Sequence, residues 1–182
     1  MLGALVVVVA AAAAVPPPTS TVGATLLEAT PGQTLRYADG DEVVVANVNR
    51  EGLSGADVNL RRSPGRLSGS VGTEPVALKL EPNRLDGHIG DNPIGLDVLR
   101  SGDELQIMGA FGNRAVALNV RANLVDGQVG PCFLRLAPQQ GIYFGRISCG
   151  GPPRQVRFTV PVSLVARPDD ELAAMLVSIL AR

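Results

Sequence analysis

Aromatic residues are scarce in this chain of 182 residues, which has four Phe, two Tyr and no Trp. Surfaces that bind sugars or single-stranded nucleic acids usually rely on exposed aromatic rings for stacking. With only six aromatic residues, several of them needed in a core, both kinds of surface are disfavoured. The formal net charge of −1 also provides no overall field to attract nucleic acid or anionic lipid.

His88 is the only histidine, which excludes zinc sites with several histidines. A Ser-His-Asp arrangement could arise only from chance proximity of the three residues. Asp86 and Asp97 are expected to share the outward face of one hairpin with His88. We interpret that acid–histidine group as a solvated surface rather than a catalytic site. No phosphate-binding glycine loop and no cofactor motif accompanies it, so the sequence predicts a protein that is not an enzyme and has no cofactor.

Cys132 and Cys149 are the only two cysteines. Both fall at the turn ends of neighbouring hairpins, at the same edge of the expected sheet. In an oxidising compartment this placement predicts a disulfide, with two unpaired small hydrophobic residues as the alternative.

The first residues favour export. Leu2 to Val15 is an uninterrupted apolar run of signal-peptide length, followed by three prolines, and no Lys or Arg precedes it. We interpret residues 1–15 as a signal peptide or a retained anchor, with a buried strand or helix as the third possibility. Residues 16–24 are expected to form a flexible linker. The predicted location is therefore periplasmic, cell-surface or extracellular.

A repeat occupies the middle of the chain. Five similar segments, of which Leu85-Asp86-Gly87-His88-Ile89-Gly90 is one, each carry a central glycine. After each of them apolar residues recur two apart, which is typical of a strand with one buried face. The central glycines, which we interpret as structural, are Gly69, Gly87, Gly109, Gly127 and Gly145.

Two-residue loops at Thr73-Glu74, Asp91-Asn92 and Asn113-Arg114 would close these hairpins. That register predicts Gly69 opposite Leu78, Gly87 opposite Leu96 and Gly109 opposite Leu118. Glycine inside a strand costs about 0.5–1 kcal/mol relative to alanine, so its recurrence needs a reason. We favour curvature of the sheet; relief of crowding in a flat sandwich is the alternative.

The rest of the chain completes an all-β prediction for residues 25–166. Gln33–Tyr37 and Glu42–Val48 are expected strands, Val43-Val44-Val45 is expected to be buried on both faces or covered, and Arg61–Gly65 is expected to be a loop. Residues 168–182 predict an amphipathic helix with an acidic first turn, packed on the sheet mouth or the outer face. The expected fold is an antiparallel meander of repeated hairpins that curls into a barrel or a sandwich.

These features favour an exported, non-enzymatic binding or structural protein of the cell envelope or extracellular space, working with a protein partner or by self-association. A carrier of a small apolar ligand inside the curved sheet is the alternative, with Leu78, Leu96 and Leu118 lining its cavity. We expect no nucleic-acid partner, and contact with a membrane only through an uncleaved N-terminal segment.

Overall fold

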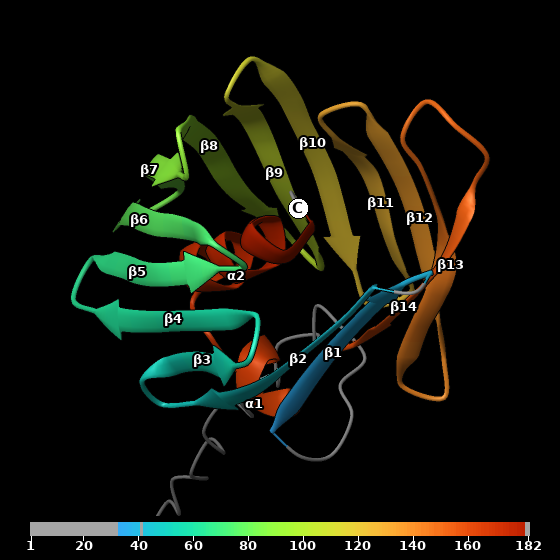
Figure 1. Cartoon of the computed structure of the whole chain (residues 1–182), viewed down its shortest axis with the longest axis horizontal. Coiled ribbons are helices and arrows are strands. Elements are labelled where there is room, and N and C mark those ends of the chain that lie inside the picture. The colour runs from blue at the N-terminus through green and yellow to red at the C-terminus, as the bar shows by residue number, and fades with distance from the viewer. Residues whose placement is uncertain (1–32, 41, 181–182) are drawn as a thin grey trace, which may run out of the picture.

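Fourteen antiparallel strands form a closed barrel in the computed structural model, which describes residues 33–40 and 42–180 (Figure 1). Each strand pairs with the next along the chain, and β1 pairs with β14 to close the wall. The segments interpreted as signal peptide or anchor and as linker lie outside the described residues. The strands are β1 (Thr34–Asp39), β2 (Glu42–Asn49), β3 (Gly52–Gly55), β4 (Val58–Ser63), β5 (Arg66–Val71), β6 (Glu74–Glu81), β7 (Arg84–Ile89), β8 (Asn92–Ser101), β9 (Glu104–Phe111), β10 (Arg114–Arg121), β11 (Leu124–Val129), β12 (Cys132–Gln139), β13 (Ile142–Ser148) and β14 (Arg154–Thr159).

The predicted all-β meander is confirmed, and it closes into a barrel rather than a sandwich. Apolar residues two apart point inward along each strand and are buried, as the period of two requires.

The prediction for Val43-Val44-Val45 was wrong. Val44 is fully buried, but Val43 and Val45 point outward and are 40% and 44% exposed. Arg61–Gly65 is also not wholly a loop, because β4 extends to Ser63.

The predicted hairpin register was wrong by two residues. Val71 pairs with Glu74, so the loop is Gly72-Thr73 rather than Thr73-Glu74. The physical reason is that Gly72 adopts a positive φ of 59°, a loop conformation that glycine reaches without strain, and so it belongs to the turn itself. The same shift moves the other two loops, whose first residues are Gly90 and Gly112.

Each repeat glycine consequently faces different partners from those predicted. Gly87 pairs with Leu78 of the preceding strand and Ile94 of the following one, not with Leu96. The corresponding partners are Leu60 and Val76 for Gly69, Leu96 and Val116 for Gly109, Leu118 and Leu134 for Gly127, and Leu136 and Val156 for Gly145. Leu78, Leu96 and Leu118 therefore do lie beside repeat glycines, but those of the next hairpin.

The repeat glycines allow neighbouring strands to approach closely. A Cβ atom added to Gly87 would lie 2.1 Å from the carbonyl oxygen of Ala77, and one added to Gly145 would lie 1.8 Å from that of Arg135. Gly87 also has a φ of 146°, which side chains other than glycine rarely tolerate. The glycines thus permit a local bend that a side chain would block, and this favours curvature over relief of crowding.

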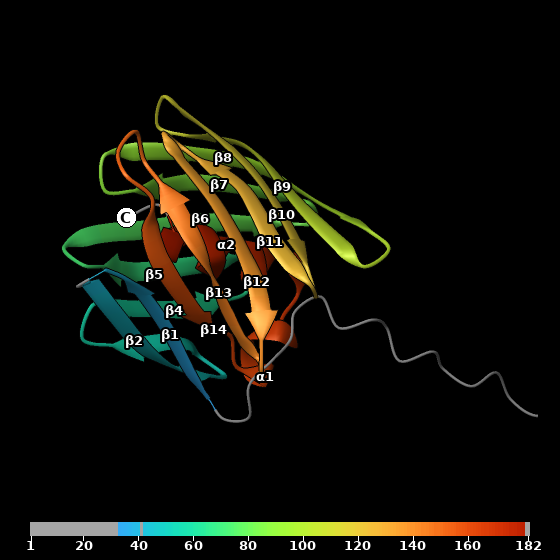
Figure 2. The same cartoon turned by 90° about the vertical axis from the view of Figure 1, so that its right-hand side faces the viewer.

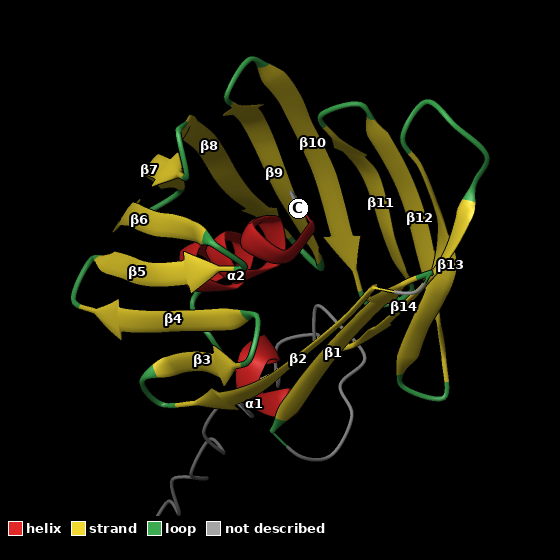
Figure 3. Cartoon of the chain, in the orientation of Figure 1, coloured by secondary structure: helices red, strands yellow, loops and turns green. Residues whose placement is uncertain are grey.

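Two helices follow the last strand, α1 (Val162–Val165) and α2 (Asp169–Leu180). Helix α2 lies inside the barrel, surrounded by strands in Figure 1 and Figure 3, and it contacts β5, β6, β7 and β8. The expectation that it would cover the mouth or the outer face was wrong. Every residue from Glu171 to Leu180 is buried, so this part of the helix has no solvated side.

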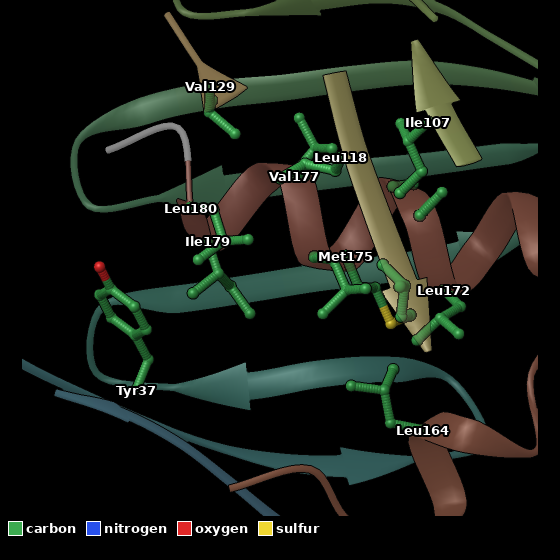
Figure 4. Close-up of a cluster of buried hydrophobic side chains, with 14 of the residues drawn as sticks. Tyr37, Ile107, Leu118, Val129, Leu164, Leu172, Met175, Val177, Ile179 and Leu180 are labelled. Carbon is green, nitrogen blue, oxygen red and sulfur yellow. The ribbon is translucent and has the colours of Figure 1, made fainter. Parts of the chain in front are cut away.

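The sequence explains why α2 fits inside. Its large apolar residues include Met175 and Ile179, which join the core cluster shown in Figure 4. The side away from them carries Ala173, Ala174, Val177 and Ser178, which are uncharged and all buried. The hydroxyl of Ser178 donates to the carbonyl oxygen of Ala174 at 2.7 Å, so its burial leaves no unsatisfied donor.

Ion pairs fix the first turn of α2 to the barrel. Arg100, at the end of β8, donates to both carboxylate oxygens of Asp169. Glu171 is buried and pairs with Arg62 of β4 and, at 3.2 Å, with Arg167. The acidic first turn predicted from the sequence therefore does more than complement the helix dipole, because two of its carboxylates bind arginines.

Candidate functional site

The two aspartates near His88 both accept hydrogen bonds from an arginine. On the outer face of β7 and β8, Arg84 donates to Asp86 at 2.9 Å and to Asp97 at 2.7 Å. The hydrogen bonds to these carboxylates raise the pKa of Arg84. His88 instead lies opposite Ala77 and Pro93. No group of three or more potential metal-ligating side chains occurs within the described part of the chain.

Cys132 and Cys149 lie at disulfide distance, with 2.07 Å between their Sγ atoms. They continue the β12–β13 ladder beyond its last pair, Phe133 with Ser148, because the two cysteines are the next residues outward on each strand. The bridge therefore joins the ends of β12 and β13 opposite the turn that connects them.

Leu78, Leu96 and Leu118, the residues expected to line a ligand cavity, are all buried in the hydrophobic core. Helix α2 belongs to the same core, and the close-up in Figure 4 shows Leu118 and Val177 in that cluster. The inward side of β5–β8 is thus covered by the protein's own C-terminal helix rather than left open.

Several bases on the outer wall between β6 and β11 are paired with acidic neighbours. Lys79 pairs with Glu81, and the hydrogen bond between them raises the pKa of Lys79. Arg84 lies between two aspartates, and Arg121 pairs with Asp126 at 2.8 Å. From β6 to β11, these bases each have an acidic neighbour.

Another part of the wall carries an unbalanced set of arginines. We define the arginine face as four exposed residues on adjacent strands: Arg36 of β1, Arg135 of β12, Arg146 of β13 and Arg157 of β14. The outward positions of these four strands hold no Asp or Glu. Within the described residues, no ion pair joins any of the four arginines to a carboxylate. Figure 2 turns this side of the wall toward the viewer.

Acidic groups near the arginine face are already engaged. Asp126 of β11 is the register partner of Arg135, but its carboxylate accepts a hydrogen bond from Arg121. Asp39, at the end of β1, is buried and pairs with Arg154 at 2.8 Å. Among the described residues, neither of these carboxylates forms an ion pair with one of the four arginines.

A hollow of about 280 Å³ opens within the arginine face. Arg146 and Arg157 border it together with two exposed amides, Gln139 and Gln155. Gly145 also lines the hollow, at the point where β13 lies close to the backbone of Arg135. The guanidinium of Arg157 lies 5.6 Å from the centre of the Phe144 ring, a cation–π contact at the edge of the hollow.

A second hollow, of about 390 Å³, lies on the outer face of β5–β7 and is bordered by Gly87. Its charged lining differs from that of the first. Lys79 and Asp86 each form an ion pair, and Arg66 beside them has none among the described residues. Within the described part of the chain, the hollow by Gly145 therefore has two arginines without an ion pair and no carboxylate in its lining, whereas the lining of the second hollow includes the carboxylate of Asp86.

No protein-family model matches the chain, and comparison with curated proteins and with solved structures likewise gives no significant match. In the described part of the chain, no helix is both long and apolar enough to cross a membrane. The residues of the site therefore have to be interpreted from their own geometry.

Sequence reasoning missed the arginine face because it used the charge of the whole chain. The arginines were visible, but they are scattered between positions 36 and 157. Only the closure of β1 onto β14 brings Arg36 near Arg157. The register partner of Arg157 is Ala38, which lies two residues from Arg36 along β1. The alternation of apolar and polar residues in the sequence could have indicated part of this face, because it places Arg135 and Arg146 on the outward side of their strands.

Proposed function

We propose that this is an exported, non-enzymatic binding protein that acts through the outer wall of its barrel. The observation that carries this proposal is the position of helix α2. Its residues from Glu171 to Leu180 are buried among the strands, so the inward side of β5–β8 serves as a core rather than as a binding chamber.

Export is supported by two independent features. One is the apolar segment Leu2 to Val15, which has the length of a signal-peptide core. The other is the cysteine pair at disulfide distance, since disulfides persist mainly in oxidising compartments. Both fit an extracytoplasmic protein that binds a component of its surroundings.

Two measurements on the native protein test this function. The N-terminal residue and the intact mass reveal whether the first segment is removed and whether two hydrogens are lost by disulfide formation. The mature protein should also sediment with washed envelope material and be released by salt. A protein that retains Met1, has reduced cysteines and stays in the supernatant at every ionic strength would contradict the proposal.

Native extraction distinguishes this function from that of a carrier. The protein is purified without detergent, extracted with organic solvent, and the extract is analysed by mass spectrometry. An outer-wall binding protein should release no stoichiometric apolar molecule. Recovery of one such molecule per chain would favour the carrier and would require α2 to leave room for it.

A further inference from the structure

The arginine face concentrates positive charge on a molecule whose formal net charge is −1. Four guanidinium groups lie on adjacent strands with no acidic residue at an outward position between them. Like charges at this density repel one another, and the repulsion is relieved when an anion binds.

Arg135 and Arg146 show this repulsion most directly, because they are register partners on β12 and β13. Like charges directly opposite one another destabilise an antiparallel pair. The Cys132–Cys149 bridge lies three residues along each strand and ties the two strands together at this end. The two charges are therefore held side by side, as a site for an anion requires.

The hollow adjoining Arg146 supplies recognition beyond charge. Arginine presents planar, forked donors that match a carboxylate, and Gln139 and Gln155 add both donors and acceptors. An anion whose acidic group is surrounded by hydroxyl groups satisfies all of these side chains. A volume of about 280 Å³ equals that of about nine liquid waters, on the scale of one sugar ring.

The extent of the arginine face points to a chain rather than to a single small anion. Neighbouring strands are about 4.8 Å apart, so β12 and β1 are separated by roughly 14 Å along the wall. One carboxylate cannot contact Arg135 and Arg36 together. A flexible polymer can follow the convex wall, whereas a planar bilayer would touch it along a narrow line.

We propose that the arginine face binds an acidic polysaccharide. One uronic-acid ring occupies the hollow, with its carboxylate on Arg146 and Arg157 and its hydroxyl groups on Gln139 and Gln155. Carboxylates of neighbouring sugars bind Arg135 and Arg36. This recognition depends on guanidinium groups and amides, so it does not need the exposed aromatic rings that the chain lacks. The inference rests on the proposed binding function of the outer wall.

Binding of polygalacturonate to the mature, disulfide-bonded protein tests the proposal, with uncharged dextran as the neutral control. The test variant is Arg146→Gln with Arg157→Gln. The matched control variant is Arg61→Gln with Arg66→Gln, which removes the same amount of charge from exposed positions on β4 and β5. Circular dichroism and thermal unfolding establish that each variant folds. Arg36→Gln, at an exposed residue without an ion pair, provides a second test if the double variant does not fold.

The proposal expects binding to polygalacturonate but not to dextran, weakened by added salt. The Arg146/Arg157 variant should bind at least about tenfold more weakly, since charge-assisted hydrogen bonds are lost, while the matched variant changes little. Equal losses in both variants would show attraction by net charge alone and would overturn the site.

Binding to vesicles of anionic phospholipid in place of polygalacturonate would also overturn the proposal. Failure of the site is distinguishable from failure of the proposed function. If the Arg146/Arg157 variant still sediments with envelope material, the outer wall binds elsewhere. If the unaltered protein does not sediment with that material, the binding function itself is wrong.

Discussion

Arg135 and Arg146 occupy directly opposite positions on β12 and β13, inside the span closed by the Cys132–Cys149 bridge. A neutral pair at these positions would stabilise the ladder, whereas two guanidinium groups oppose it. This hairpin therefore combines an electrostatic cost with a covalent link that offsets it, and the two effects can be separated by mutation.

Removing the bridge with Cys132→Ser and Cys149→Ser should lower the free energy of unfolding by about 3 kcal/mol. Because charge repulsion then acts on an unlinked hairpin, the loss should be larger at low ionic strength. Adding Arg146→Gln should recover about 0.5–1 kcal/mol in the bridge-free protein. Urea denaturation at two salt concentrations measures all three values. No recovery at low salt would show that the arginines do not strain the hairpin.

Gly87→Ala should destabilise the barrel by about 3 kcal/mol or more, because the new Cβ would lie 2.1 Å from the carbonyl oxygen of Ala77. Gly102→Ala is the matched control. Gly102 has a φ of 63° but no atom within 4 Å of the added Cβ, so only the backbone cost of about 1–2 kcal/mol applies. Thermal or urea unfolding distinguishes them, and similar losses in both variants would contradict the close approach of the strands.

Met175→Ala should cost about 2–5 kcal/mol, because Met175 is fully buried and its truncation leaves a cavity beside the strands. Val162→Ala, in helix α1, should change the free energy of unfolding by about 0.5 kcal/mol or less, since Val162 is 54% exposed. Equilibrium unfolding followed by far-ultraviolet circular dichroism measures both. A negligible effect of Met175→Ala would place α2 outside the core.

Glu171→Gln should cost about 2–3 kcal/mol, because the buried carboxylate binds both Arg62 and Arg167 and its loss leaves Arg167 without a carboxylate partner. The control is Asp170→Asn in the same turn, which removes only a favourable interaction with the helix dipole of about 0.3–1 kcal/mol. Denaturant titration compares the two. Equal losses in the free energy of unfolding would mean that the ion pairs of Glu171 contribute no stability beyond that of its charge.

Much of this fold could be predicted from local patterns. The period-two runs identified the strands, and the cysteine positions in neighbouring hairpins predicted their pairing. The register failed by two residues because the glycine of each loop, such as Gly72, was assigned to the strand. Sequence alone does not reveal that its φ is positive.

Long-range features were harder to predict. The helix was expected at the sheet mouth or on the outer face because Leu172, Met175 and Ile179 form an apolar stripe along one side. Ala173, Ala174, Val177 and Ser178, on the remaining surface, are uncharged, so that surface is equally compatible with burial. The arginine face could not be predicted either, because it depends on closure of the barrel between β1 and β14.

The proposed binding at the outer wall depends on the position of α2, because a helix inside the barrel leaves the outer wall as the surface for binding. Hydrogen–deuterium exchange of the full-length mature protein measures that position directly. If α2 fills the barrel, the amides of residues 172–180 exchange as slowly as those of β6 and β7, through opening of the whole barrel. Rapid exchange in the helix, with these strands still protected, would contradict the account by showing that α2 does not fill the barrel.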